Sequence, residues 1–76
     1  MLFADWLITE FGNPRAVRRA AESLGYAVRT VRSWRDLERF PNARAQEIIR
    51  LKSAGRVNID AWRRVYLAKK DGEVTQ

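Results

Sequence analysis

Residues 28–36, with the sequence VRTVRSWRD, place polar and charged side chains on one side of a predicted helix. On a helical wheel of about 100° per residue, Val31 and Trp34 fall on the opposite side and can pack against a core. Arginine binds the edge of guanine, serine binds several base edges, a carboxylate accepts from cytosine, and valine contacts the thymine methyl group. The candidate base-reading residues are Val28, Arg29, Arg32, Ser33 and Asp36.

The same pattern also fits an ordinary surface helix, because charged side chains opposite an apolar stripe form the solvated face of any amphipathic helix. The surrounding charge favours recognition of a polyanion, since residues 15–35 contain six arginines and one acid, Glu22. Asp36 has two possible roles, because it lies one helical turn beyond Arg32. It can hold that guanidinium in position, or it can accept from a cytosine amine.

The segment before this helix has the residue types that a helix-turn-helix unit requires. Ala21 is small enough for the close crossing of two helices, and Gly25 tolerates the positive φ of the sharp turn. Tyr26 can seal the turn, and Val31 and Trp34 can dock the second helix. In such a unit the second helix lies in the major groove of DNA.

Further residues border the unit at positions suited to bind phosphates. They lie in the early turns of the second helix and at the start of the fourth, where free backbone N–H groups also favour an anion. Arg35 falls at the edge of the wheel, so it is expected to meet a phosphate or only water. Each of these residues, taken alone, also fits a plain surface position. The candidate phosphate-binding residues are Arg15, Arg18, Arg19, Arg35, Asn42 and Arg44.

The spacing of apolar residues predicts about five short helices, and the only candidate strand is the short segment GRVNI. We expect the first three helices at residues 2–11, 14–24 and 28–38. Asn13 is expected to cap the second helix, with Pro14 in its first turn. The expected fold class is therefore all-α.

The second half of the chain follows the same rules. Asn42 and Asn58 are expected to cap the fourth and fifth helices. The final segment, KKDGEVTQ, offers little to bury. We therefore expect one domain over residues 1–68, with the helix-turn-helix unit at about 14–38, and a flexible tail over residues 69–76.

Three tryptophans, Trp6, Trp34 and Trp62, are expected to anchor the core. The alternative is that they form stacking platforms for single-stranded nucleic acid, which would require them to be exposed. The apolar stripe of the fifth helix either completes the domain's own core or meets a second copy of the chain. Trp62 and Tyr66 are accordingly the candidate dimer contacts.

Composition limits the classes of function. The 76 residues contain no cysteine and no histidine, which removes disulfides, thiolate metal sites and the usual general base. We therefore expect no enzymatic activity, no cofactor and no metal. The net charge of +6 and the pI of about 10.8 favour nucleic acid as partner, with an anionic membrane surface second. No apolar run is long enough to span a membrane, and the start does not read as a signal peptide.

The segment AVRRAAESLGYAVRTVRSWRDLERFPNARAQEIIRLKSAGRVNIDAWR resembles the small Cro/cI-type repressors of the λ-repressor-like helix-turn-helix superfamily. Within that superfamily it is most similar in style to the Cro-like proteins of prophages and to antitoxin-type regulators. The resemblance covers about residues 12–65. The matching positions are Ala21, Leu24, Gly25, Thr30, Val31, Trp34, Pro41, Ile48, Ile49, Leu51 and Gly55.

The resemblance implies a transcriptional regulator, a Cro-like repressor of phage or prophage origin, in the cytoplasm of a bacterial host. It implies double-stranded DNA and a second copy of the chain as partners, with half-sites about one helical turn apart. No membrane and no small-molecule ligand are expected. The family's base-reading places fall on Val28, Arg29, Arg32 and Ser33. Its backbone-clamping places fall near Arg18 and around Asn42 and Arg44.

The chain departs from the family pattern at three places. Ala27 stands where a Ser or Thr usually caps the recognition helix, which weakens that helix start by roughly 1 kcal/mol. Arg32 stands where the family has a serine, and Val17 and Arg18 lie where a glutamine is usual. The added arginines suggest a larger phosphate contribution to binding and a steep dependence on salt.

Two other functions fit the same residues. The helix-turn-helix unit can belong to a phage assembly or packaging protein, or dock another protein, with specificity in Trp62, Tyr66 and the tail. RNA or single-stranded DNA is the third possibility. Gel filtration separates the first alternative from a dimeric repressor, and a competition between single strands and duplex tests the second.

Overall fold

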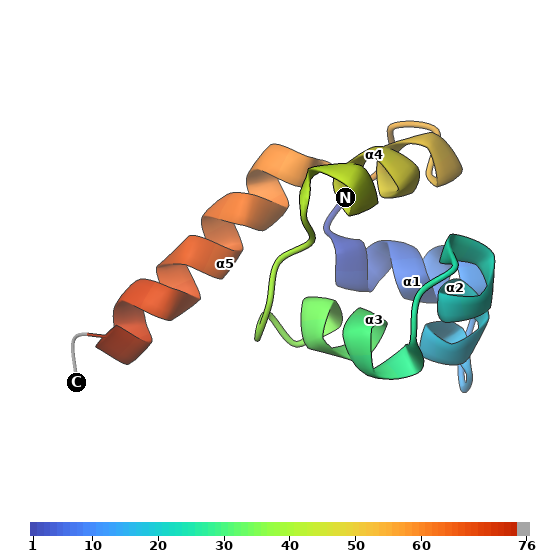
Figure 1. Ribbon diagram of the computed structural model, residues 1–76, viewed down its shortest axis with the longest axis horizontal. Coiled ribbons are helices and arrows are strands. Elements are labelled where there is room, and N and C mark those ends of the chain that lie inside the picture. Colours follow the sequence, from blue (N-terminus) through green and yellow to red (C-terminus); the bar gives the residue numbers. More distant parts are fainter. Residues whose placement is uncertain (75–76) are drawn as a thin grey trace.

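The computed structural model describes the backbone of residues 1–74 and the side chains of residues 1–72. The chain forms five helices and, within this described part, no strand (Figure 1). The predicted all-α fold class is confirmed. The helices are α1 (Phe3–Phe11), α2 (Ala16–Leu24), α3 (Val28–Arg35), α4 (Ala43–Lys52) and α5 (Ile59–Val74).

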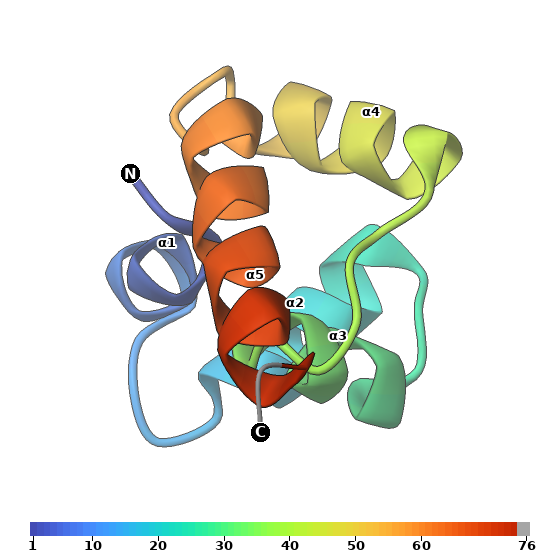
Figure 2. The same cartoon turned by 90° about the vertical axis from the view of Figure 1, so that its left-hand side faces the viewer.

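Helices α1, α2 and α3 pack around one core, and α4 lies above them in both Figure 1 and Figure 2. Phe3 lies at the centre of the core: its ring stacks on Trp62 with 4.5 Å between centroids and meets the edge of Trp34 at 6.1 Å. Trp6, Trp34 and Trp62 are all buried. Their predicted role as core anchors is confirmed, and the buried rings offer no stacking platform to a single strand.

The turn between α2 and α3 has the conformation that the sequence predicts. Gly25 adopts the left-handed region, with φ 81° and ψ 29°, and its N–H donates to the Ala21 carbonyl at 2.9 Å. Tyr26 donates its N–H to the same carbonyl at 3.1 Å, and its ring meets the edge of Trp34 at 5.0 Å. The glycine ends α2, and the tyrosine covers the junction with α3.

The start of α2 differs from the prediction. Asn13 is not its cap and Pro14 is not in its first turn, because α2 begins at Ala16. Arg15, with φ −109° and ψ 35°, precedes the helix and makes no side-chain capping bond. Residues 12–15 therefore form a loop that carries the chain from the end of α1 to α2.

Helix α3 is three residues shorter than predicted. It ends at Arg35 because Leu37 adopts a positive φ of 62°, which a right-handed helix cannot contain. The Leu37 side chain packs against the core, and the Ser33 carbonyl accepts from the N–H groups of Glu38 and Arg39. The conformation of one partly buried leucine thus accompanies the end of α3.

Helices α4 and α5 begin at the predicted caps. The side-chain oxygen of Asn42 accepts from the Ala45 N–H at 2.9 Å, and that of Asn58 accepts from the Ala61 N–H at 2.9 Å. Both asparagines satisfy backbone donors that a helix N-terminus leaves unpaired.

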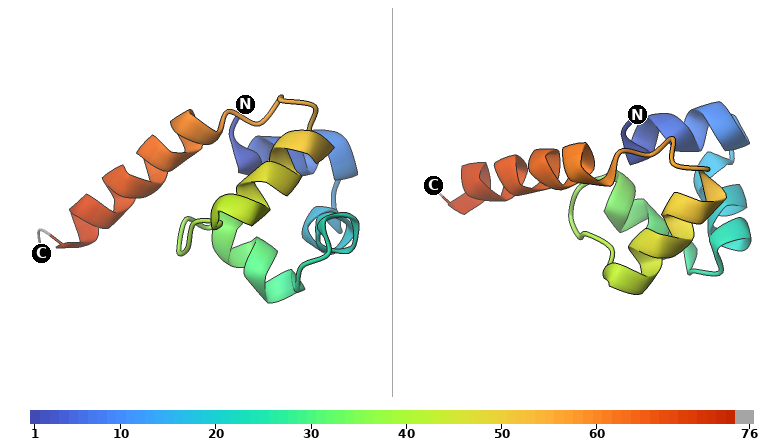
Figure 3. Two further views of the ribbon diagram at one scale, coloured as in Figure 1. Left: turned by 45° about the horizontal axis from the view of Figure 1, so that its top comes forward. Right: turned by 90° about the horizontal axis from the view of Figure 1, so that it is seen from above.

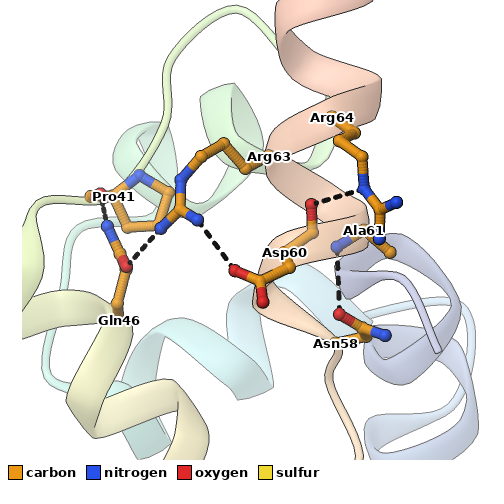
Figure 4. A network of polar contacts seen from close by, with 7 residues as sticks. All are labelled: Pro41, Gln46, Asn58, Asp60, Ala61, Arg63 and Arg64. Carbon is orange, nitrogen blue, oxygen red and sulfur yellow. Dashed lines mark hydrogen bonds and ion pairs between the residues drawn. The ribbon is translucent and has the colours of Figure 1, made fainter.

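A polar network fixes the start of α5 against the start of α4 (Figure 4). Arg63 donates to Asp60 at 2.9 Å and to the side-chain oxygen of Gln46 at 3.1 Å, and it lies over the ring of Phe40. Gln46 in turn donates to the Pro41 carbonyl at 2.8 Å. The guanidinium therefore joins the loop before α4, α4 itself and α5.

The second half of α5 extends away from the other helices (Figures 1 and 3). The sequence analysis placed a flexible tail at residues 69–76, whereas α5 continues as a helix to Val74. Residues 75 and 76 lie outside the described residues. The helix is held to the body by its first two turns, chiefly through Trp62, of which 1% is exposed.

Candidate nucleic-acid interface

The exposed face of α3 carries Arg29 and Arg32, as the helical wheel predicts. Val31 and Trp34 lie in the core, with 0% and 4% of their surfaces exposed. Within residues 1–72, the side chain of neither exposed arginine makes a hydrogen bond or an ion pair. Two guanidinium groups are thus available to an external acceptor.

A groove lies between α1, the first turn of α2 and α3, with a volume of about 300 Å³. We call it the arginine groove. Its apolar lining comes from all three helices, and its charged lining comes from both sides of the turn between α2 and α3. The apolar residues of the groove include Leu7, Ile8, Val17 and Val28, and its arginines are Arg15, Arg18, Arg32 and Arg35.

The arginine groove brings predicted base-reading and phosphate-binding residues together. Arg15 and Arg18, from the start of α2, line the same groove as Arg32 of α3. Among the described residues these three arginines have no acidic partner at ion-pair distance. The fold therefore concentrates uncompensated positive charge beside α3.

Asp36 does not hold Arg32 in position, which corrects one of its two predicted roles. Its carboxylate accepts two hydrogen bonds from Arg35, from Nε at 2.8 Å and from Nη2 at 3.2 Å. These bonds, more than the nearby charges of Arg35, Lys69 and Arg32, hold the pKa of the Asp36 carboxyl below its usual range, although burial opposes them. The same pair raises the pKa of the Arg35 guanidinium. Arg35 thus lines the groove with its positive charge largely neutralised by the Asp36 carboxylate.

Ser33 and Val28 are only partly exposed. The Ser33 hydroxyl donates to the Thr30 carbonyl at 2.7 Å, so its proton is used within α3 and its oxygen remains as an acceptor. Val28 packs against the core while also lining the arginine groove. Of the five predicted base-reading residues, Arg29 and Arg32 are therefore the exposed and unpaired ones.

The other flank of α3 meets the start of α4 across an open hollow of about 520 Å³. Thr30 of α3 lines this hollow together with Asn42 and Arg39. The Asn42 oxygen caps α4, which leaves its amide N–H₂ group to donate elsewhere. Arg44 lies exposed in the first turn of α4 and has no partner among the described residues.

Arg19 is placed differently from the other predicted phosphate-binding residues. Its Nη1 donates to the Phe11 carbonyl at 2.9 Å, so its guanidinium satisfies the end of α1. It is absent from the lining of the arginine groove. Because the guanidinium is bonded within the chain, Arg19 is less available to bind a phosphate than predicted.

The two predicted dimer contacts, Trp62 and Tyr66, are placed against the chain's own core. Trp62 stacks on Phe3 inside the core, so it is not accessible to a second chain. Tyr66 is half-buried against the ring of Phe40, with 5.4 Å between centroids. Among the described side chains of α5, the exposed large apolar residues are Val65 and Leu67, with 39% and 50% of their surfaces exposed.

Arg39 is the residue that the sequence analysis missed. It is exposed, lines the hollow between α3 and α4, and has no acidic partner within the described residues. Its position depends on the non-helical chain from residue 36 to residue 42, whereas the apolar spacing predicts a helix that continues to residue 38. The excess of arginine over acid in the residues before Pro41 is the signal that could have identified it.

The structure does not suggest a metal site or a bilayer span. Among the side chains of residues 1–72, no group of three carboxylates gathers where a metal ion could be held. Among the described helices, none combines the length and the apolar character needed to cross a membrane.

No protein-family model matches the chain, and no curated protein or solved structure matches it either.

Proposed function

We propose that this protein binds duplex DNA with sequence preference and regulates transcription, in the manner of the Cro-like repressors that it resembles. The observation that carries the proposal is the charge around α3. Arg29 and Arg32 lie unpaired on its exposed face, and unpaired arginines border it on both flanks. A helix of this kind, following a tight glycine turn, suits the major groove.

The residues of α3 would divide the reading of bases by their chemistry. Arg29 and Arg32 suit forked hydrogen bonds to guanine, and Val28 suits the methyl group of thymine. Ser33 acts only as an acceptor, because its proton is bonded to Thr30, so it suits the amine of adenine or cytosine. This division predicts a preference for guanine opposite the two arginines.

Phosphate contacts would come from the flanks. Arg15 and Arg18 lie on the α2 side of the recognition helix, while Arg44 and the amide of Asn42 lie on the α4 side. The two sets suit the two backbones that border a major groove. Each arginine contact releases counterions, so binding should weaken steeply as salt rises.

Two copies occupy a two-fold-related site, with half-sites about 34 Å apart. Trp62 is buried in the core, and Val65 and Leu67 are the large apolar residues that α5 leaves exposed up to residue 72. A stable dimer needs about 800 Å² of buried surface on each partner. The homodimer therefore forms on the DNA, and the free chain is monomeric.

Selection of bound duplexes from a random DNA library, at near-physiological salt, tests the function directly. A palindromic consensus with guanine in each half-site is the expected result, and gel filtration of the resulting complex should give two chains for each duplex. An empty selection, with the free chain eluting as a ring or with another protein, would overturn regulation of transcription in favour of an assembly role.

Arg29→Ala and Arg32→Ala should each weaken binding to the selected duplex by about 1–3 kcal/mol and relax the preference at one base position. Arg64→Ala is the matched control, because Arg64 is exposed on α5 and its side chain contacts only the Asp60 carbonyl. Fluorescence anisotropy with selected and random duplexes measures both effects. If both α3 variants bind both duplexes as the parent does, α3 is not the recognition helix.

A further inference from the structure

We propose that the arginine groove is a binding site for a small organic anion, with an apolar aromatic or aliphatic body that ends in a carboxylate or phosphate. The groove combines two features that a site for a DNA phosphate alone does not need together. It has an apolar floor, and it has arginines around that floor. The proposal concerns a ligand other than DNA and does not require that the chain bind DNA.

The floor of the groove is shaped by apolar side chains from three helices. Leu7 and Ile8 come from α1, Val17 from α2 and Val28 from α3. Ile8 keeps 53% of its surface exposed and lines the groove, so part of the apolar floor faces water. A ligand with an apolar body would remove this surface from water.

The charge around the floor is positive and mostly uncompensated. Arg15, Arg18 and Arg32 line the groove without an acidic partner among the described residues. Arg35 also lines it, paired with Asp36. Like charges so close together repel one another, and a carboxylate or phosphate relieves this repulsion through forked hydrogen bonds.

The size of the groove limits the ligand. Its volume of about 300 Å³ lies at the lower end of the range for small-molecule sites. It is also more enclosed than the hollow between α3 and α4. The groove therefore suits a single ring or a short acyl chain with one anionic head.

One consequence rests on the proposed function. Arg18 and Arg32 line the groove and also belong to the proposed DNA interface. A bound organic anion would occupy the guanidinium groups that the duplex needs. The ligand and DNA would then compete, and the ligand would act as an inducer that releases the operator.

Titration of the full chain with phenyl phosphate, followed by amide chemical shifts, tests the site itself. Inorganic phosphate is the comparison, because it has the same head and lacks the apolar body. Phenyl phosphate should bind about tenfold more tightly, with shifts centred on Ile8, Val17 and Val28. Equal affinities, or shifts spread over the whole basic surface, would overturn the proposal.

Two pairs of variants separate the contribution of the apolar floor to ligand affinity from that of the arginines. Ile8→Gln should lower the affinity for phenyl phosphate and leave inorganic phosphate unchanged, whereas Leu51→Gln, at an exposed apolar site on α4, should change neither. Arg15→Gln should lower both affinities, whereas Arg44→Gln, which removes the same charge outside the groove, should lower them less. Matching losses within either pair would show general anion binding and overturn the site.

Addition of phenyl phosphate to the protein–duplex complex tests the consequence. Release of DNA at the concentration that saturates the groove supports competition, and unchanged DNA binding at that concentration overturns it. A protein that binds phenyl phosphate in the groove and binds no duplex at all would overturn the proposed function while supporting the site. The two failures are therefore distinguishable.

Discussion

At the scale of single residues, the pair of Arg35 and Asp36 controls how much positive charge reaches the groove beside α3. The two side chains are 39% and 42% exposed, and both hydrogen bonds of the pair lie at the end of the recognition helix. Next to them, Arg32 has no such partner. The carboxylate thus neutralises one of the four groove arginines and leaves the others free.

Asp36→Asn should therefore strengthen binding to duplex DNA. The variant frees Arg35 for a phosphate, so the slope of log affinity against log salt should steepen by about one contact. Anisotropy measured over a salt series gives both quantities. Glu47→Gln is the control, since it frees Arg50 from a similar exposed pair on α4. Equal gains in the two variants would assign the effect to net charge rather than to Arg35.

The same pair predicts a dependence on pH. The pKa of Asp36 is lower in the folded chain than in the unfolded chain, so its stabilising effect is present above the unfolded value, near 3.9. The effect is lost as the pH falls through the lower folded value. An exposed pair contributes less than about 1 kcal/mol. Carboxyl NMR titration should show the pKa of Asp36 rising in Arg35→Gln, and an unchanged pKa would contradict the assigned cause.

At the scale of elements, the chain predicts its helix starts where the cap is local. Asn42 and Asn58 each accept from a backbone N–H three residues ahead, and a sequence of three or four residues contains all of that interaction. The end of α3 depends on Leu37, whose positive φ accompanies packing against distant parts of the core. Such a boundary is set by tertiary structure, which is why periodicity placed it three residues too late.

The missing cap of α3 provides a prediction about stability. Ala27 occupies the N-cap position with extended backbone angles, φ −68° and ψ 149°, and has no side chain to accept a hydrogen bond. Ala27→Ser should stabilise the domain by about 1 kcal/mol, which is roughly 4–8 °C in melting temperature. Thermal unfolding followed by circular dichroism measures the shift.

Ala43→Ser is the matched control for this change. Ala43 is the first residue inside α4, where Asn42 already provides the cap. A serine there has no equivalent backbone donor to satisfy, so no gain is expected. A gain of the same size in both variants would contradict a capping effect at Ala27.

At the scale of the whole molecule, the first helix and the start of the last helix meet in one aromatic stack. Phe3 from α1 and Trp62 from α5 lie nearly parallel, at 5° between ring planes. The Met1 carbonyl accepts from the Asn58 N–H at 2.8 Å, close to the same point. Closure of the domain therefore depends on an apolar contact between residues 59 positions apart.

Trp62→Ala should destabilise the domain by about 3–5 kcal/mol, which is a large share of the stability of a small domain. Leu67→Ala provides the comparison, because Leu67 is half exposed on the extended part of α5 and should change stability little. Urea unfolding midpoints measure the difference. If Leu67→Ala lowers the free energy of unfolding as much as Trp62→Ala does, Leu67 is buried in solution, and its exposure in the single chain is contradicted.

The candidate site was predictable only in part. The wheel identified Arg29 and Arg32 as exposed and Val31 and Trp34 as buried, because a helix fixes these directions locally. The arginine groove was not predictable, since it needs α1 to supply its floor and a loop to deliver Arg15.

In the extended half of α5, Lys69 Nζ donates at 2.8 Å to the carbonyl of Asp36, the residue that follows α3. One surface hydrogen bond is worth only about 1 kcal/mol, whereas the Trp62 contact is far stronger. We therefore expect the two halves of α5 to open with different free energies. Its first two turns open only when the whole domain unfolds, while the turns beyond Tyr66 exchange their amide hydrogens through cheap local openings. Each such opening should break the hydrogen bond from Lys69 to the Asp36 carbonyl, so opening of the extended half of α5 changes the hydrogen bonding where α3 ends.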